Sequence, residues 1–301
     1  MNGFYVKAIK YVGLGILLLI MFFEKSHSQQ ACPVPLYTDP AYMGAADPEI
    51  IWNEHEGEWW FYYTTRRSVG ENTPLPSLAI GVAASDDWLT WEHKGYIKID
   101  GVGGTPTGPN VLWAPGIVRD GDTYHMMVTF KKGDGRGGRW GIPESLLLHL
   151  VAPKDQLLHG WKTQGILHTS FSAIDATIIK HQGTWNVFHR DVISDKNGVN
   201  TYRITTDDLY SKHGKWNYQG PASGDVNDFS AHQLNYQEAQ HVFFWKNTYW
   251  MLADPSNKKE PGFALYRSDD LEDWVFTGHI MDNGPFEVQH PSVAMVDDRA
   301  F

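Results

Sequence analysis

Five segments of the chain share one pattern of apolar and polar positions: an apolar run, a short polar turn and an aromatic-rich run. They are residues 45–65, 112–130, 173–191, 237–254 and 289–301. The turns contain Gly57, Gly121, Gly183, Asn247 and Asp298, the residue types that tight hairpins need. Each segment therefore predicts a β-hairpin, and five copies indicate an internal repeat.

A second signal follows four of the hairpins: a short apolar strand, an Asp-rich turn and a Trp. It is clear at residues 85–91, 206–216 and 268–274, and weaker at 152–161. Each unit thus predicts four strands, and successive hairpin turns are 64, 62, 64 and 51 residues apart. This organisation is typical of β-propeller blades, whereas the lack of long helical periodicity in the mature region disfavours an α/β barrel.

The predicted fold class is therefore all-β, a five-bladed β-propeller. The sequence ends at Phe301, in what the pattern predicts to be the second strand of the fifth unit. We expect the fifth blade to be truncated there. The propeller domain is predicted over residues 44–301, after an N-terminal segment over 29–43 that is too short to replace three strands.

The start of the chain predicts a secretory signal peptide over residues 1–28. Lys7 and Lys10 precede an apolar run of 12 residues from Val12 to Phe23, which is short for an uncleaved membrane anchor. We expect a secreted or periplasmic protein without a membrane attachment after cleavage. Lipoprotein acylation at Cys32 is the less favoured alternative, because no Leu stands three residues before it.

Composition narrows the class of partner. The chain has 25 Lys+Arg against 35 Asp+Glu, a formal charge of −10, which argues against a nucleic-acid partner. Its 13 Trp, 14 Tyr and 14 Phe suit an all-β fold and surfaces on which sugars stack. A single Cys excludes an internal disulfide framework.

The first strand of a propeller blade is innermost, so the starts of these strands meet around one axis. Counting back from the five turns places Asp47, Trp113, Asp175, Glu238 and His290 at equivalent starts. Three carboxyl groups close together raise one another's pKa, and a proton, a cation or a catalytic role must resolve their charge. The pattern therefore predicts an acidic pocket, with Trp113 fitting either the core or a sugar platform.

The ends of the second strands return to the same rim and add further polar groups. The predicted substrate-binding residues are Trp113, Arg66, Arg67, His189, Arg190 and Asp254. Ordinary solvated loop charge is the alternative for these groups. Arg190, which stands between two other polar residues at a hairpin end, is the better candidate for a ligand contact.

The same segments resemble glycoside hydrolase family 43, five-bladed propeller enzymes that act on arabinosides and xylosides. ADPEII, IDATII and YQEAQHVFFWKNTYWML resemble its first-, third- and fourth-blade motifs. The resemblance implies that Asp47 is the general base, that Asp175 orients the general acid and modulates its pKa, and that Glu238 is that acid. QHPSVAMVDDRAF resembles the fifth-blade motif, whose histidine, here His290, would approach a central ion through water.

The chain departs from the family pattern at Ala176, where a Pro is usual, and at Ala239-Gln240, where Gly-Pro is usual. The resemblance implies an inverting hydrolase of plant or algal oligosaccharides or polysaccharides. No cofactor is expected to be required, although a structural calcium or sodium ion would fit the central channel. The alternatives are a non-catalytic carbohydrate-binding propeller, a polysaccharide lyase propeller, and a related propeller glycosidase acting on neoagaro-oligosaccharides, which uses a histidine acid.

Overall fold

The structure is a computed structural model. It describes residues 36–41, 44–66, 79–99, 111–131, 145–168, 173–191, 200–210, 215–228, 237–255, 262–280 and 288–301. The predicted signal peptide, Cys32 and Arg67 lie outside these ranges. Within them, no helix has the length and apolar character needed to cross a membrane.

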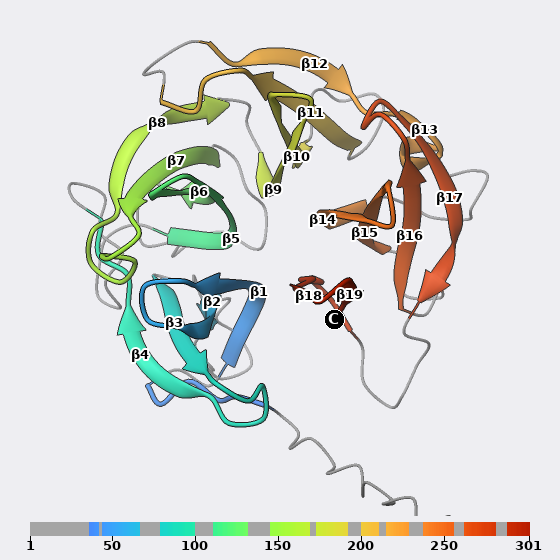
Figure 1. The fold of residues 1–301 in the computed structure, drawn as a ribbon. Helices are drawn as coiled ribbons and strands as arrows, with labels where there is room; N and C mark the ends of the chain where they lie inside the picture. Colours follow the sequence, from blue (N-terminus) through green and yellow to red (C-terminus); the bar gives the residue numbers. More distant parts are fainter. Residues whose placement is uncertain are drawn as a thin grey trace, which may run out of the picture. The chain divides into compact units, whose positions relative to one another are not determined.

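Four sheets of four sequential antiparallel strands surround a common centre (Figure 1). The first contains β1 (Gly44–Asn53), β2 (Glu58–Arg66), β3 (Ile80–Ser85) and β4 (Glu92–Tyr96). The second contains β5 (Val111–Asp120), β6 (Thr123–Lys131), β7 (Leu146–Pro153) and β8 (Lys162–His168). The third contains β9 (Ile174–His181), β10 (Thr184–Asp191), β11 (Asn200–Thr206) and β12 (Asn217–Pro221).

The fourth sheet contains β14 (Gln237–Trp245), β15 (Thr248–Pro255), β16 (Phe263–Ser268) and β17 (Asp273–Ile280). A two-residue strand, β13 (Ser223–Gly224), pairs in parallel with the outer edge of β17 and is followed by a 3₁₀ turn at Asp225–Asn227. The fifth unit is a small hairpin of β18 (Met295–Val296) and β19 (Arg299–Ala300). The predicted all-β propeller with four full blades and an incomplete fifth unit is therefore confirmed.

Apolar side chains fill the spaces between neighbouring blades. Successive side chains of a strand point to opposite faces, so Met126 on β6 packs toward the first blade and Met127 toward the third. Two edge-to-face aromatic pairs also join neighbouring blades. The ring centroids of Tyr62 and Trp161 are 6.2 Å apart, and those of Phe188 and Trp274 are 5.6 Å apart. This packing fixes the blades radially, so their inner strands face one another around the axis.

The inner strand of each full blade contains a β-bulge near its start. The register shifts fall between Ala46 and Glu49, Trp113 and Gly116, Ile174 and Thr177, and Glu238 and His241. Two residues of the inner strand therefore oppose one residue of the second strand. A bulge bends its strand and redirects a side chain, which makes these four points the natural positions for a site.

Candidate active site

The first bulge residue of each inner strand has a left-handed backbone, and the fifth unit has a residue of the same kind. The five are Asp47 (φ 50°), Ala114 (45°), Asp175 (56°), Ala239 (55°) and His290 (56°). A positive φ is uncommon for residues other than Gly, and Asn, Asp and His adopt it most readily. Asp47, Asp175 and His290 therefore adopt the backbone of the bulge at low cost, and they also place ionisable groups at the axis.

Two of the predicted equivalences need correction. In the second and fourth blades the equivalent positions are Ala114 and Ala239, so Trp113 and Glu238 lie one residue earlier. In the second blade the count failed because Gly121 is the first residue of its two-residue turn, whereas Gly183 is the second. Strand register, rather than distance from the turn, defines which residues meet at the axis.

Side chains of the second strands fix the bulges of the next blade. Thr64 Oγ1 accepts the Ala114 N–H at 2.8 Å, and Thr129 Oγ1 accepts the Asp175 N–H at 3.2 Å. Asp254 accepts the backbone N–H of His290 in the same way. Asp254 is thus built into the framework of the site, and the carboxyl group that the sequence assigned to substrate contact also positions His290.

The third blade has Arg190 at the corresponding place on its second strand, and an arginine cannot accept a hydrogen bond. Asp175 replaces that link, because its Oδ2 accepts the Ala239 N–H at 3.2 Å. Arg190 instead approaches Glu238, with its Nε 3.4 Å from Oε2. Asp175 and Arg190 together therefore hold the strand and the side chain of Glu238.

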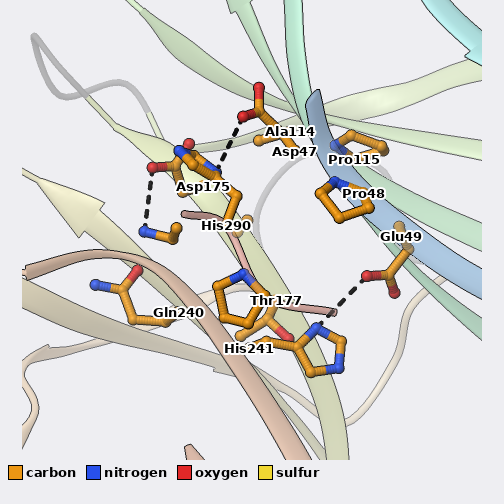
Figure 2. A pocket seen from close by; sticks show the side chains of 13 residues that line it. Asp47, Pro48, Glu49, Ala114, Pro115, Asp175, Thr177, Gln240, His241 and His290 are labelled. Atoms are coloured by element: carbon orange, nitrogen blue, oxygen red, sulfur yellow. Dashed lines mark hydrogen bonds and ion pairs between the residues drawn. The ribbon is translucent and has the colours of Figure 1, made fainter. Parts of the chain in front are cut away.

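Asp47, Asp175 and His290 lie together at one end of a small cavity, about 30 Å³ in volume, on the axis (Figure 2). The Nδ1 atom of His290 is 3.2 Å from Oδ1 of Asp47. Asp47 and Asp175 are only 8% and 6% exposed, whereas the Glu238 side chain is 28% exposed. Of these three carboxyl groups, Glu238 is the one that a bound molecule reaches most easily.

Burial and mutual repulsion change the protonation of this cluster. Burial raises the pKa of Asp175 to about 6 and that of Asp254 to about 7, and the charge of Glu238 adds to both shifts. Burial lowers the pKa of His290, but the surrounding carboxylates outweigh it, so this pKa lies above its ordinary value. Asp175 and Asp254 therefore gain and lose protons close to neutral pH, the range that acid–base chemistry uses.

The other predicted residues are less closely associated with the cluster. Trp113 is half-buried on the same rim, opposite Thr129 in the register. His189 is fully buried, with Nε2 3.8 Å from Oδ2 of Asp191, so the structure does not bring it to the open face. The side chain of Arg66 and all of Arg67 lie outside the described residues, and their roles stay predictions.

Sequence reasoning missed a second layer of axial residues, two positions after each bulge start. It consists of Glu49, Gly116, Thr177, His241 and Ser292. Glu49 and His241 line the same cavity as the carboxyl cluster and lie at its other end (Figure 2). Glu49 follows the predicted axial residue Asp47 by two positions, whereas His241 follows the predicted Glu238 by three. The constant spacing of two therefore appears only after the register is corrected to Ala239.

One group of residues could hold a cation. Glu238, Asp254 and His290 each offer a ligand atom, and these atoms lie within 4.8 Å of one another. Two carboxylates are suitable oxygen ligands for calcium or sodium, which prefer oxygen to imidazole nitrogen. The donor set therefore fits an ion held by the two carboxyl groups, with water completing its shell and His290 contacting that water.

Comparison with known proteins agrees with the class of protein that the fold and site define, a propeller with an acid–base cluster on its axis. Residues 37–256 match the sequence profile of glycosyl hydrolases family 43. The chain belongs to this family and is a glycoside hydrolase. A search of curated proteins found no match.

Solved structures show the same fold at low identity. A β-xylosidase/α-arabinofuranosidase from a compost metagenome, solved with xylotriose in a calcium-free form, shares 13% identity over 88% of this chain and 86% of its own, with a TM-score of 0.62. An exo-1,5-α-L-arabinanase from a bovine ruminal metagenomic library shares 16% over 88% of each chain, with a TM-score of 0.59. A family 117 glycoside hydrolase of Zobellia galactanivorans shares 16% over 80% and 71%, with a TM-score of 0.58.

Proposed function

We propose that this family 43 chain is a secreted, inverting glycosidase that removes arabinofuranosyl or xylosyl units from plant or algal glycans. The observation that carries this proposal is the arrangement at the axis. Two buried aspartates occupy bulge starts, and the more exposed Glu238 lies beside them, tied to Arg190. An inverting enzyme needs two carboxyl groups with different roles and a water between them.

Asp47 is assigned as the general base. It lies on β1, where the Asp47–His290 contact fixes the direction in which its carboxylate points. A base in this position removes a proton from the water that attacks the anomeric carbon. Because the water approaches from the side opposite the leaving group, the configuration at that carbon inverts.

Glu238 is assigned as the general acid. Its exposed side chain can reach the glycosidic oxygen of a bound sugar, and its proton leaves with that oxygen when the bond breaks. Asp175 holds the next residue of the same strand through the Ala239 N–H. Its charge and that of the neighbouring carboxyl group repel each other, which is consistent with the modulating role that the family resemblance implies for Asp175.

The rim supports carbohydrate binding. Trp113, which is half-buried and directly precedes the pocket residue Ala114, would offer an aromatic face, and Arg190 and Asp254 would offer hydrogen-bonding groups for sugar hydroxyls. The solved relatives include proteins described as a β-xylosidase/α-arabinofuranosidase and an arabinanase, which supports pentose substrates. Others are described as a β-1,3-galactosidase and an exo-β-1,3-galactanase, so a test must include galactosides.

Secretion is proposed from the sequence of residues 1–28. A protein recovered from the culture medium or the periplasm should begin at Gln29, and a mature chain that still contains the apolar run would contradict the assignment. For the ion, Glu238 and Asp254 would hold calcium or sodium in the central channel, where it would balance negative charge, and His290 would contact it through water. Hydrolysis itself would proceed through Asp47 and Glu238.

The test uses a panel of aryl arabinofuranosides, xylosides and galactosides, together with neoagaro-oligosaccharides, and follows the anomer first released by ¹H NMR. We expect release of a pentose with inverted configuration. Glu92→Gln, at an exposed carboxyl group on β4, is the control for general charge effects. Binding without turnover would identify a carbohydrate-binding propeller, unsaturated products a lyase, and cleavage of the neoagaro-oligosaccharides alone the related glycosidase.

A further inference from the structure

Glu49 stands two residues after Asp47 on β1, at the far end of the same bulge. Its Oε1 accepts the backbone N–H of Ile117 on β5 at 3.1 Å. The Ser292 hydroxyl donates to its carboxyl group. The same Ser292 Oγ accepts the N–H of Ile50 at 3.1 Å, so this serine closes a loop of hydrogen bonds between β1 and the fifth unit.

Glu49 also reaches across the axis. Its Oε2 is 3.5 Å from Nδ1 of His241 on β14, and the fifth unit lies between β14 and β1 in the ring (Figures 1 and 2). His241 in turn forms a hydrogen bond with the backbone of Val293, beside the fifth-unit residue Ser292. One carboxyl group therefore connects the inner segments of the first, second and fourth blades and of the fifth unit.

Other residues of this layer make shorter connections. Thr177 Oγ1 accepts the Val242 N–H at 3.3 Å, which joins only the third and fourth blades. Gly116 has no side chain, and an added Cβ would lie 2.1 Å from the Ala176 carbonyl oxygen. Among the described members of the layer, Glu49 thus has the widest reach.

The layer lies directly under the proposed catalytic cluster. Asp47, Asp175 and His290 each precede a member of it by two residues, and His241 follows Ala239, whose N–H binds Asp175, by two. A shift of one strand along this layer therefore moves a carboxyl group of the cluster by a similar amount. Misplacement of a catalytic group by about 1 Å can cost about a hundredfold in rate.

We propose that Glu49 is a positioning residue for the reaction: by connecting four inner segments across the axis, it sets the placement of Asp47 relative to Asp175 and Glu238. This inference rests on the proposed function of that cluster. Glu49 itself lies at the opposite end of the cavity from Asp47 and Asp175 (Figure 2), and acts through the backbone of β1.

The contact between Glu49 and His241 joins two neutral groups at neutral pH. Burial raises the pKa of Glu49 to about 8, against the hydrogen bonds from Ile117 and Ser292 that lower it. Burial lowers the pKa of His241 to about 4. A glutamine can therefore reproduce the neutral side chain at position 49, whereas an alanine removes every connection.

The titratable groups that line the cavity around Glu49 are Asp47 on its own strand, Asp175 on β9, His241 on β14 and His290 before β18. Ionised Glu49 adds a further negative charge beside two aspartates. Between the ordinary carboxyl pKa and about 8, the folded chain holds a proton at Glu49 that the unfolded chain has lost. The stability that Glu49 contributes therefore falls as the pH rises through this window, and Glu49→Gln lacks this contribution.

The experiment compares wild type, Glu49→Gln, Glu49→Ala, Thr177→Val and the exposed control Glu92→Gln. We measure kcat and KM on an activated aryl glycoside at pH 6 and pH 8.5, and the melting temperature from pH 5.5 to 8.5. Glu49→Ala should lower kcat about 10- to 100-fold with KM within about threefold, because placement is lost while the rim is intact. Glu49→Gln should stay within about threefold of wild type at pH 6 and lose less activity at pH 8.5.

The melting temperature of wild type should fall by several degrees more than that of Glu49→Gln across this range. Thr177→Val, which removes one connection, should lower kcat less than Glu49→Ala. If Glu49→Ala does not fold, Ser292→Ala, which also removes one connection to Glu49, should lower kcat about 3- to 10-fold with unchanged KM. The proposal is overturned if folded Glu49→Ala has the kcat of wild type. If Glu49→Ala does not fold, a wild-type kcat in Ser292→Ala overturns it. It is also overturned if the kcat of Glu49→Gln at pH 6 is as low as that of Glu49→Ala.

Failure of the proposed function is distinguishable from failure of this inference. If wild type cleaves none of the glycosides, the assigned reaction is wrong, and the melting curves still decide whether Glu49 connects the blades. A Glu49→Ala that melts at the same temperature as wild type would then refute the role of Glu49. A Glu49→Ala that melts below Glu49→Gln at pH 6 supports the connection.

Discussion

Replacing Glu238 with alanine tests the assignment of the proton donor. A general acid matters in proportion to how much the leaving group needs a proton. A sugar alkoxide needs one, whereas a dinitrophenolate leaves almost unaided. Glu238→Ala should therefore impair the cleavage of natural oligosaccharides far more than that of dinitrophenyl glycosides.

The expected loss of activity follows from the exposure of Glu238 and from the usual contribution of general acid catalysis. The Glu238 side chain is 28% exposed, more than Asp47 and Asp175 beside it, so we expect the fold to tolerate its removal better than that of either aspartate. The lost proton transfer is worth about two to four decades, about 3–5.5 kcal/mol of barrier, for an oligosaccharide. Removal of one negative charge also lowers the pKa values of Asp175 and Asp254, which now stand at about 6 and 7.

The assay compares kcat/KM for an oligosaccharide and for aryl glycosides of graded leaving-group pKa, in wild type, Glu238→Ala and Glu238→Gln. Glutamine keeps the volume and an acceptor for Arg190, so it separates loss of the proton from loss of the contact. We expect both variants to lose about 100- to 10,000-fold on the oligosaccharide and under about tenfold on the dinitrophenyl glycoside. An equal fall on both substrates would show that Glu238 is not the acid.

Three further predictions follow from the same geometry. Asp47→Asn should lose at least about a hundredfold in turnover on every substrate with binding retained, and wild type should release the sugar with inverted configuration; a retained anomer released by wild type would make Asp47 a nucleophile instead of a base. Asp175→Asn should shift the alkaline limb of the rate profile to lower pH, because the charge opposing ionisation of the neighbouring acid is gone; an unchanged limb would contradict its modulating role. Since Asp254 has a raised pKa in the folded chain, folding retains a proton there between about pH 4 and 7, and the urea midpoint should fall over this window in wild type more than in Asp254→Asn.

The sequence predicted the propeller because its signals are local and repeated. Hairpin turns, aromatic strands and Asp-rich turns recur in each unit, and each is determined by a few neighbouring residues. The register of the inner strands was harder to obtain. No residue type is common to all four bulges, which occur at Asp47-Pro48, Ala114-Pro115, Asp175-Ala176 and Ala239-Gln240. The turn of the first blade also has four residues where the others have two.

Contacts between blades were the part that the sequence did not reveal. That Asp254 accepts the His290 N–H, or that Arg190 approaches Glu238, depends on which strand ends meet across a blade boundary. His189 was predicted at the rim and is not there. It stands beside Arg190 in the chain, yet strand alternation turns it into the interior, where it is fully buried.

The bulges explain how one scaffold concentrates acidic groups without losing its closure. A regular inner strand would alternate its side chains between the two neighbouring blades, and none would be presented along the axis. The extra residue at each bulge turns one side chain toward the axis and leaves a backbone N–H that must be satisfied. In each described case the acceptor is a side chain of the preceding blade. Second strands provide it at Thr64, Thr129 and Asp254, and the third blade provides it from its inner strand, at Asp175. Asp175 and Asp254 are thus also structural acceptors, so substitution of either should affect both stability and rate. Glu238 accepts no such N–H among the described contacts, so its substitution should affect rate more than stability.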